Sequence, residues 1–296
     1  MELDDQNSTE QVLVEPSMID QISTDKTIIH EGLDYNAHSL LDLAIMVESE
    51  ITGQSIVEFK NSFRLQMIVL KSQFKDTLGI NLETLNRLLH HVYGKQGFSV
   101  DWKAFFKVKN VLLSKVLARR KGVPISLGIL LIEMLTEIGF DAQGICFPSG
   151  FIVVVNLEGK AVYLDPFNGE LVDKQQLELK VRGQLGNHMR LTPDMLKIDS
   201  KETVIKRYIN VIKASYIQDE KVELALLCSD ILLRLDPDDA YEVRDRGFLF
   251  QQLDCFKLAC NDFTYFIEQC PKDPIVSLLQ QQIKYMDEES STQTIH

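Results

Sequence analysis

Asp165, at the end of the segment KAVYLD, has the residue type and setting of the acid in a catalytic triad. An aspartate that ends a strand can orient the imidazole of a histidine, which then acts as general base toward a cysteine nucleophile. The cysteine of such a triad stands at the N-terminus of a helix, where the helix dipole and the histidine lower its pKa. Whether the chain is an enzyme therefore depends on the residues at the helix start and just before the next strand.

A buried helix and short strands are predicted around Asp165. Pro124 fits the first turn of a helix and Gly139 fits the position just past its end, and the segment between them is apolar on almost every side. The segments GICF, FIVVVN and KAVYLD are predicted strands, the last two joined by a tight turn at Glu158 and Gly159. A buried helix followed by strands is the skeleton of papain-like and transglutaminase-like enzymes.

Three segments on this skeleton resemble one bacterial family. RRKGVPISLGILL, GICFPSGF and YLDPFNGE are similar to the signature of SirB-type regulators, in which a transglutaminase-like core precedes tetratricopeptide repeats. RYINVIKASY and RDRG, which begin at Arg207 and Arg244, resemble the repeat region of that family. The resemblance covers roughly residues 37–286. It implies an α+β fold with N-terminal helices and a papain/transglutaminase-like core, followed by an all-α tetratricopeptide-type repeat unit.

The resemblance also implies that two catalytic groups are missing. The family motif FPGHF would place the base at Gly150, DPFNGG places the acid at Asp165, and the nucleophile of true transglutaminases would fall at about Pro124. Loss of a nucleophile or of a base typically lowers the rate by several orders of magnitude. We therefore expect a pseudoenzyme without a cofactor, in which Asp165 caps its own DPFNG turn.

The alternative is a cysteine-dependent hydrolase or acyl transferase with a relocated nucleophile. Cys146 lies on the strand beside the turn, Ser149 precedes Gly150, and His188 follows in the segment LGNHMRL. A strand cysteine lacks the field of a helix N-terminus, and His188 stands about 20 residues beyond Asp165 with no spacing rule to recommend it. The residues therefore favour this alternative less than the pseudoenzyme.

Residues 200–286 are predicted to be helical repeats with a period of 34 residues, the length of the tetratricopeptide unit. Small residues at Ala225 and Ala259 allow paired helices to approach closely, and Gly247 and Phe263 stand where this unit requires them. Several residues one period apart match: Tyr216 with Phe250, Val222 with Phe256, Ala225 with Ala259, Pro237 with Pro271, and Asp239 with Asp273.

Four residues of the repeat region are candidates for binding a protein partner: Tyr216, Arg244, Asp245 and Arg246. Adjacent Arg and Asp side chains on a repeat helix can bind charged groups of a partner, or they can anchor the short array to the preceding domain. The sequence allows both roles. The first functional hypothesis is a non-catalytic interaction or regulatory protein that holds a partner in the repeat groove and in the reshaped core cleft.

Charge and composition exclude several other classes. The 296 residues are 45% hydrophobic and 25% charged, with no apolar run long enough to span a membrane. A pI near 5.0 makes nucleic acid an improbable partner. Residues 1–36 hold nine acids and one base, which fits neither a secretory signal nor a transit peptide. We expect a cytoplasmic protein with an acidic disordered tail at 1–36, domains at 37–199 and 200–286, and a tail at 287–296.

Local signals predict further helix ends and two features without a functional role. Gly79 is a plausible C-cap, Asn81 an N-cap for the helix that ends at Gly94, and Asp173 caps another helix. The five cysteines include no CxxC pair and are expected to be small buried hydrophobes. A run of bases between Lys103 and Lys121 is expected to be a solvated helix face, with Phe105 and Phe106 in the core.

Overall fold

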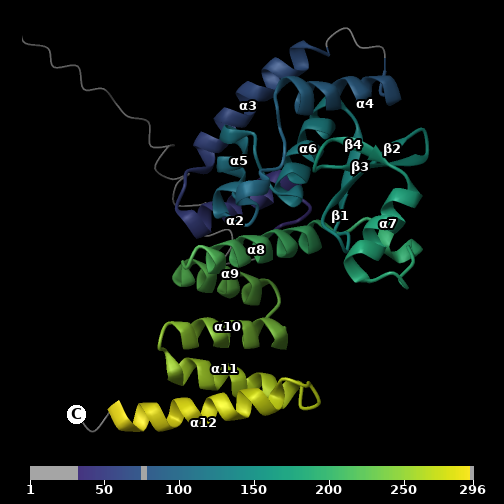
Figure 1. Ribbon diagram of the computed structural model, residues 1–296. Helices are drawn as coiled ribbons and strands as arrows, with labels where there is room; N and C mark the ends of the chain where they lie inside the picture. The colour runs from purple at the N-terminus through teal and green to yellow at the C-terminus, as the bar shows by residue number, and fades with distance from the viewer. Residues whose placement is uncertain (1–32, 75–78, 294–296) are drawn as a thin grey trace, which may run out of the picture. The chain divides into compact units, whose positions relative to one another are not determined.

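The computed structural model describes residues 33–74 and 79–293, and it places a buried helix, α6 (Pro124–Ile138), against a small antiparallel sheet (Figure 1). The sheet has the strand order β1-β2-β3-β4, with β1 (Asp141–Ile145), β2 (Ile152–Leu157), β3 (Lys160–Asp165) and β4 (Glu170–Val172). The other helices are α2 (Leu40–Thr52), α3 (Ile56–Ser72), α4 (Leu82–Leu89), α5 (Leu113–Arg119), α7 (Lys174–Leu185), α8 (Lys201–Gln218), α9 (Val222–Leu235), α10 (Ala240–Gln252), α11 (Phe256–Gln269) and α12 (Val276–Gln293). The predicted α+β class is confirmed.

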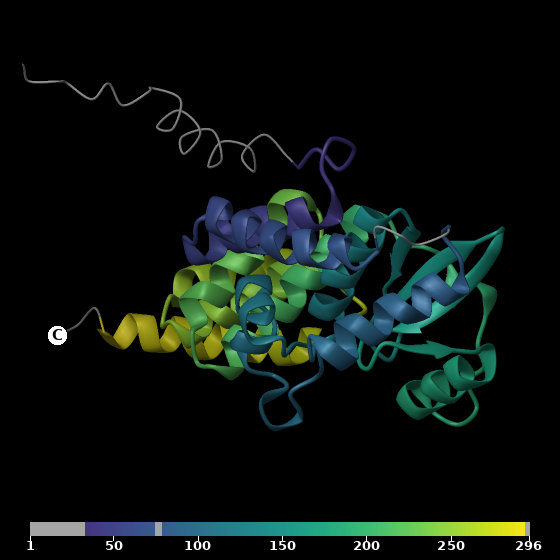
Figure 2. The same ribbon diagram turned by 90° about the horizontal axis from the view of Figure 1, so that it is seen from above.

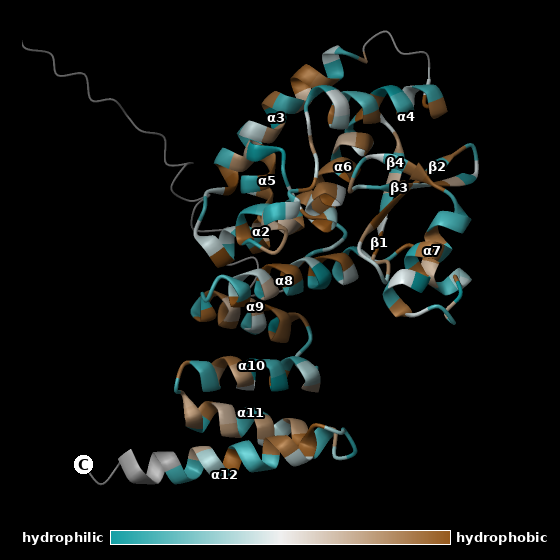
Figure 3. Ribbon diagram, in the orientation of Figure 1, coloured by the Kyte–Doolittle hydropathy of each residue, from teal (hydrophilic) through white to brown (hydrophobic). Residues whose placement is uncertain are grey.

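Helix α6 begins and ends where the sequence predicts. Pro124 occupies its first turn, and Gly139 follows its last residue with a positive φ of 114°, a conformation that glycine adopts without a steric penalty. The side chains of α6 are buried on almost every side, and Figure 3 shows the corresponding concentration of hydrophobic residues on this helix. The helix therefore lies at the centre of the core domain, and the packing around it fixes the position of its N-terminus.

Both faces of strand β2 are covered. Ile152 and Val154 belong to a cluster with Leu177 and Val181 of α7, whereas the intervening residues point to the opposite face, where α6 packs on β1 and β2. Glu158 and Gly159, with φ of 51° and 80°, form the predicted tight turn from β2 to β3. Seen from above, the strands lie to one side of the helices α2 and α8–α12 (Figure 2).

Helices α8 to α12 form the repeat region. Helix pairs α8–α9 and α10–α11 pack against each other, and α12 packs on α11 (Figure 1). Ala225 and Ala259 are fully buried, as the requirement for close approach of paired helices predicts. Gly247 of α10 faces the Phe263 ring of α11, where a Cβ at position 247 would lie 2.6 Å from the ring.

Gly247→Ala is expected to lower the free energy of unfolding by about 1–3 kcal/mol, because the added methyl group overlaps the Phe263 ring in a packed interface. Urea unfolding followed by circular dichroism measures the change. Gly183→Ala in α7 is the matched control, since a Cβ there meets no atom within 4 Å and should increase stability slightly. Equal effects of the two substitutions would contradict the packing argument.

Three local expectations differ from the structure, and a fourth falls on residues that the structure does not describe. Helix α3 ends at Ser72, so Gly79 is not its C-cap, and Gly94 lies inside a π-helical turn, η1 (His90–Lys95), that prolongs α4. Helix α12 continues to Gln293, through most of the segment predicted as a tail. The acidic segment predicted as a disordered tail lies almost wholly outside the described residues. Asn81 and Asp173 do cap α4 and α7 as predicted.

Within the part of the chain that the structure describes, no helix combines the length and the hydrophobicity required to cross a membrane. The same residues contain no group of three His, Cys, Asp or Glu side chains arranged to hold a metal ion.

Candidate functional site

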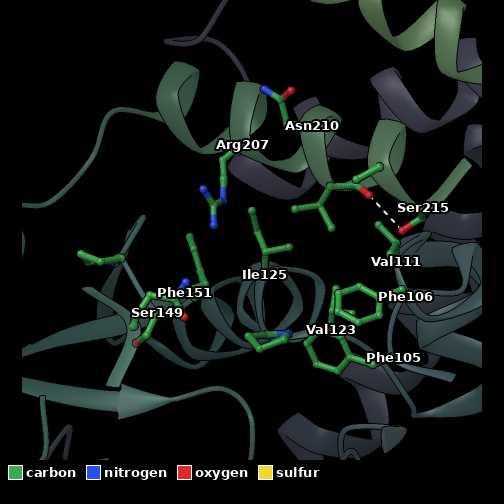
Figure 4. Close-up of a pocket in the computed structure, with 16 residues that line it drawn as sticks. Phe105, Phe106, Val111, Val123, Ile125, Ser149, Phe151, Arg207, Asn210 and Ser215 are labelled. Atoms are coloured by element: carbon green, nitrogen blue, oxygen red, sulfur yellow. Dashed lines mark hydrogen bonds between the residues drawn. The ribbon is translucent and has the colours of Figure 1, made fainter. Parts of the chain in front are cut away.

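A pocket of about 540 Å³ lies between the N-terminus of α6, the turn before β2 and helix α8 (Figure 4). Its walls are mostly apolar and include Val111, Val123, Ile125 and Phe151. The pocket brings together residues that are distant in sequence. The N-terminus of α6 and the turn before β2 form one wall, and α8 forms the opposite wall. Its position between the α6 N-terminus and the turn is that of a catalytic cleft in a transglutaminase-like skeleton.

The two positions implied for the missing nucleophile and base both line this pocket. Pro124 stands at the start of α6 and has neither a nucleophilic side chain nor an N–H group. Gly150 has a φ of 150°, a backbone conformation that L side chains rarely adopt, so a histidine at this position would be strained. Neither position therefore places a nucleophilic or basic side chain in the pocket.

The turn that carries Gly150 is held in place by the ring of Phe151. This ring lies between α6 and β1, where a Cβ at Gly128 or at Gly144 would each approach it to 2.4 Å. Both positions therefore require glycine, which lets Phe151 reach the base of the pocket. The N–H of Gly150 donates to the carbonyl of Phe147 at 2.9 Å, which closes the turn.

Asp165 is buried and does not line the pocket. Its Oδ1 accepts the backbone N–H of Phe167 at 2.9 Å, which is the turn-capping role expected from the DPFNG motif. Its Oδ2 lies 2.7 Å from Nζ of Lys180 in α7. The neighbouring Tyr93 hydroxyl donates to the Pro166 carbonyl at 2.9 Å, and burial raises the pKa of Tyr93 far above its usual value. Asp165 therefore fixes the turn after β3 against α7.

The residues of the relocated-nucleophile alternative do not form a catalytic arrangement. The backbone N–H of Cys146 donates to the Asp199 carboxylate at 2.7 Å, and burial together with this carboxylate raises the pKa of Cys146 to about 12. His188 is exposed beyond the end of α7, and no hydrogen bond joins it to Cys146 or Ser149 among the described residues. Ser149 lines the pocket, but none of the residues found lining it is a histidine.

Sequence reasoning missed the polar and aromatic side chains of the pocket. Arg207 and Asn210 of α8 line it, and Figure 4 shows the Arg207 side chain extending toward Ser149 and Phe151, whereas the Asn210 side chain points away from them. Phe105 and Phe106 line the other end, and the prediction that they belong to the core is wrong, because Phe105 is only half-buried and Phe106 is 68% exposed. A pair of aromatic residues between helices carries no signal of which face they occupy, so only the three-dimensional arrangement identifies them.

The repeat candidates lie in contacts within the protein. Tyr216 is only 3% exposed, and the groups that act on its hydroxyl are Cys228 of α9 and Glu48 of α2 in the core domain. Arg244 pairs with Asp245 at 2.6 Å and its guanidinium lies over the rings of Tyr241 and Phe266. The contacts of Arg244 stabilise α10 and α11, and they do not include the core domain.

Arg246 joins three helices of the repeat region. Its guanidinium forms two hydrogen bonds to Asp262 of α11, at 2.8 and 2.9 Å, and one to Asp230 of α9 at 3.3 Å. The sequence offered partner binding or anchoring to the core as alternatives. The structure shows Arg246 anchoring neighbouring repeat helices to one another, and its binding of a partner stays a prediction.

Comparison with known proteins gives matches along almost the whole described chain. A family model described as transglutaminase-like superfamily matches residues 47–210, and one described as tetratricopeptide repeat matches residues 212–284. A UPF0162 protein of Vibrio cholerae is 41% identical over 267 residues, which cover 89% of this chain and 97% of the relative. Protein SirB1 of Salmonella typhimurium is 36% identical over 252 residues, which cover 84% of this chain and 93% of SirB1. No solved structure matches at a significant level.

Proposed function

Because the chain belongs to the family of SirB1 and the UPF0162 proteins, with a transglutaminase-like domain before tetratricopeptide repeats, we propose that it is a non-catalytic regulatory protein of the bacterial cytoplasm. It binds a protein partner through its helical repeats and through the cleft of its core domain. Tetratricopeptide repeats are protein-binding modules, which supports the first part of this proposal.

The composition of the cleft carries the proposal. Pro124 and Gly150 line it where a nucleophile and a base would have to stand, and Asp165 is engaged by Phe167 and Lys180 outside it. A cleft of about 540 Å³ without a nucleophile or a base at these positions is suited to binding rather than to covalent catalysis.

The thiol of Cys146 is expected to react with iodoacetamide at neutral pH at least about a hundredfold more slowly than the exposed thiol of Cys255 in the same molecule. A pKa of about 12 leaves very little thiolate, which is the reactive form. Mass spectrometry of peptides after timed labelling measures both rates, and Cys255 serves as the internal control. Faster labelling of Cys146 than of Cys255 would support the hydrolase or acyl-transferase alternative.

The proposal is tested by capture of the partner with the intact chain. Removal of everything after residue 200 would also remove α8, whose Tyr208 is buried against the core, so point variants are the better probes. We expect the wild-type chain, expressed with a tag in its own host, to retain a stoichiometric partner that mass spectrometry identifies. The Cys146→Ala variant should retain the same partner to the same extent. Absence of any partner, or covalent modification of the partner that depends on Cys146, would refute the proposal.

A further inference from the structure

Resting on the proposed function, we propose that the pocket beside α8 binds an extended segment of the partner polypeptide. One bulky aliphatic or aromatic side chain of that segment occupies the apolar pocket, and a neighbouring carboxylate pairs with Arg207. The pocket is thus a recognition site for an acidic segment with a hydrophobic anchor.

The walls of the pocket select an apolar side chain. Val111, Val123 and Ile125 form one side, and Phe151 and Phe105 close its two ends. A volume of about 540 Å³ lies within the range of sites that enclose organic groups. Transfer of a large apolar side chain from water into such walls supplies most of the binding free energy of a hydrophobic anchor.

The charge of the pocket selects a carboxylate beside that anchor. Arg207 is the single charged residue among those found lining the pocket, and no hydrogen bond or ion pair of its guanidinium is formed with the described residues. A guanidinium binds a carboxylate through two parallel hydrogen bonds. Asn210 of α8 also lines the pocket, but its amide donates to the Lys206 carbonyl at 3.1 Å, so Arg207 carries the polar recognition.

The rim of the pocket favours a polypeptide over a small amphiphile. Trp102 and Phe106 are 70% and 68% exposed, and the Trp102 ring lies 4.5 Å from Phe167 and 6.2 Å from Phe105, which lines the pocket. Exposed aromatic residues beside a pocket are characteristic of protein interfaces. Lys103, next to Trp102, is exposed and adds positive charge to this rim. A ligand confined to the pocket would leave this aromatic strip uncovered, whereas a peptide would extend across it.

The test is a selection of random peptides displayed on phage against the full chain and against its Ala214→Trp variant. Ala214 is exposed on α8 and lines the pocket, so tryptophan there fills the pocket without disturbing the core. We expect the wild type to enrich peptides with one large apolar residue and nearby Asp or Glu, and the variant to lose that enrichment. Ala118→Trp on α5, also exposed but outside the pocket, is the matched control and should select the wild-type peptides. Selection of the same peptides by Ala214→Trp, or of peptides without acids, would overturn the inference.

The role of Arg207 is measured with the selected peptide in synthetic form. Arg207→Ala should weaken its binding about tenfold and Arg207→Lys by less, because lysine keeps the charge but not the two parallel hydrogen bonds. Lys257→Ala, which removes an exposed charge on α11, should leave the affinity unchanged. If decanoate binds in an Arg207-dependent way and no peptide does, the site takes a small amphiphile and the inference is wrong. If Ala214→Trp selects no pocket peptide but still captures the cellular partner, the pocket does not recognise that partner. The inference is then wrong, and of the proposed function only binding through the helical repeats stands.

Discussion

Glu48→Ala is expected to lower the free energy of unfolding by about 2–4 kcal/mol, which is a large part of the stability of an ordinary domain. Glu48 lies on α2 and is 3% exposed. Its Oε2 accepts the backbone N–H of Leu113 and, at 2.9 Å, the hydroxyl of Tyr208, and its Oε1 accepts the N–H of Ser114 at 3.0 Å. One carboxylate thus caps the first turn of α5 and binds α8.

The magnitude follows from what the substitution leaves behind. Without Glu48, the backbone N–H of Ser114 has no other acceptor among the described residues, whereas the N–H of Leu113 keeps only the Tyr208 oxygen at 3.2 Å and the buried Tyr208 hydroxyl keeps only the Val111 carbonyl at 3.3 Å. Each unsatisfied buried polar group costs about 1–3 kcal/mol. Burial and the nearby Glu48 carboxylate raise the pKa of Tyr208 well above its usual range, so its hydroxyl remains a donor at all physiological pH values.

Urea unfolding of Glu48→Ala, Tyr208→Phe and the double variant measures this network. Because the two side chains share a hydrogen bond, the effects of the single substitutions should not add, and the double variant should be less unstable than their sum. Glu268→Ala, which removes an exposed carboxylate on α11, is the control and should change stability by less than about 0.5 kcal/mol. Strict additivity of Glu48 and Tyr208 would show that they act independently.

The parts of this fold that the sequence predicts are those set by neighbouring residues. Pro124 and Gly139 delimit α6, and Glu158-Gly159 forms the turn after β2, because each of these conformations is favoured by the residue itself. The capping role of Asp165 is predictable for the same reason, since its acceptor interaction spans only two residues. Its ion pair with Lys180 depends on how α7 packs and could not be predicted.

The composition of the candidate site depends on contacts between distant segments. Arg207 reaches the turn at Gly150 because α8 is held against the core by Tyr208, and no pattern within α8 marks its exposed arginine as different from other surface charges. The π-helical turn η1 was likewise missed, because apolar spacing does not distinguish it from a continued α-helix. A motif in the sequence shows which residue type stands at an expected catalytic position, whereas the residues of a binding surface are known only once distant segments have been placed together.

Lys213→Met is expected to be the second strongly destabilising change, by about 3–5 kcal/mol at neutral pH. Nζ of Lys213 in α8 lies 2.7 and 2.6 Å from the two carboxylate oxygens of Glu242 in α10, and the Ser229 hydroxyl of α9 donates to the same carboxylate. Both charged side chains are less than 10% exposed. Removal of the cation leaves a carboxylate buried among three helices with one neutral donor.

The pH dependence of this loss distinguishes an unpaired buried charge from a simple packing defect. Burial raises the pKa of Glu242, and Lys213 opposes that effect, so the pKa of Glu242 should rise further in Lys213→Met. An unfolded chain releases the proton near the usual glutamate pKa of about 4.3, so above that pH the folded variant binds more protons than the unfolded one. Its stability must therefore fall as pH rises, and its deficit relative to wild type should grow between about pH 5 and pH 8.

Urea unfolding at several pH values measures this deficit, and the double variant Lys213→Met/Glu242→Leu is the matched control. Apolar replacement of both partners removes the buried charge, so the double variant should recover most of the lost stability and show no pH-dependent deficit. A deficit in Lys213→Met that does not change with pH would mean that Glu242 reaches water once it loses its partner. In that case the interface of α8, α9 and α10 opens to water in the variant, and the explanation from a buried unpaired charge is wrong.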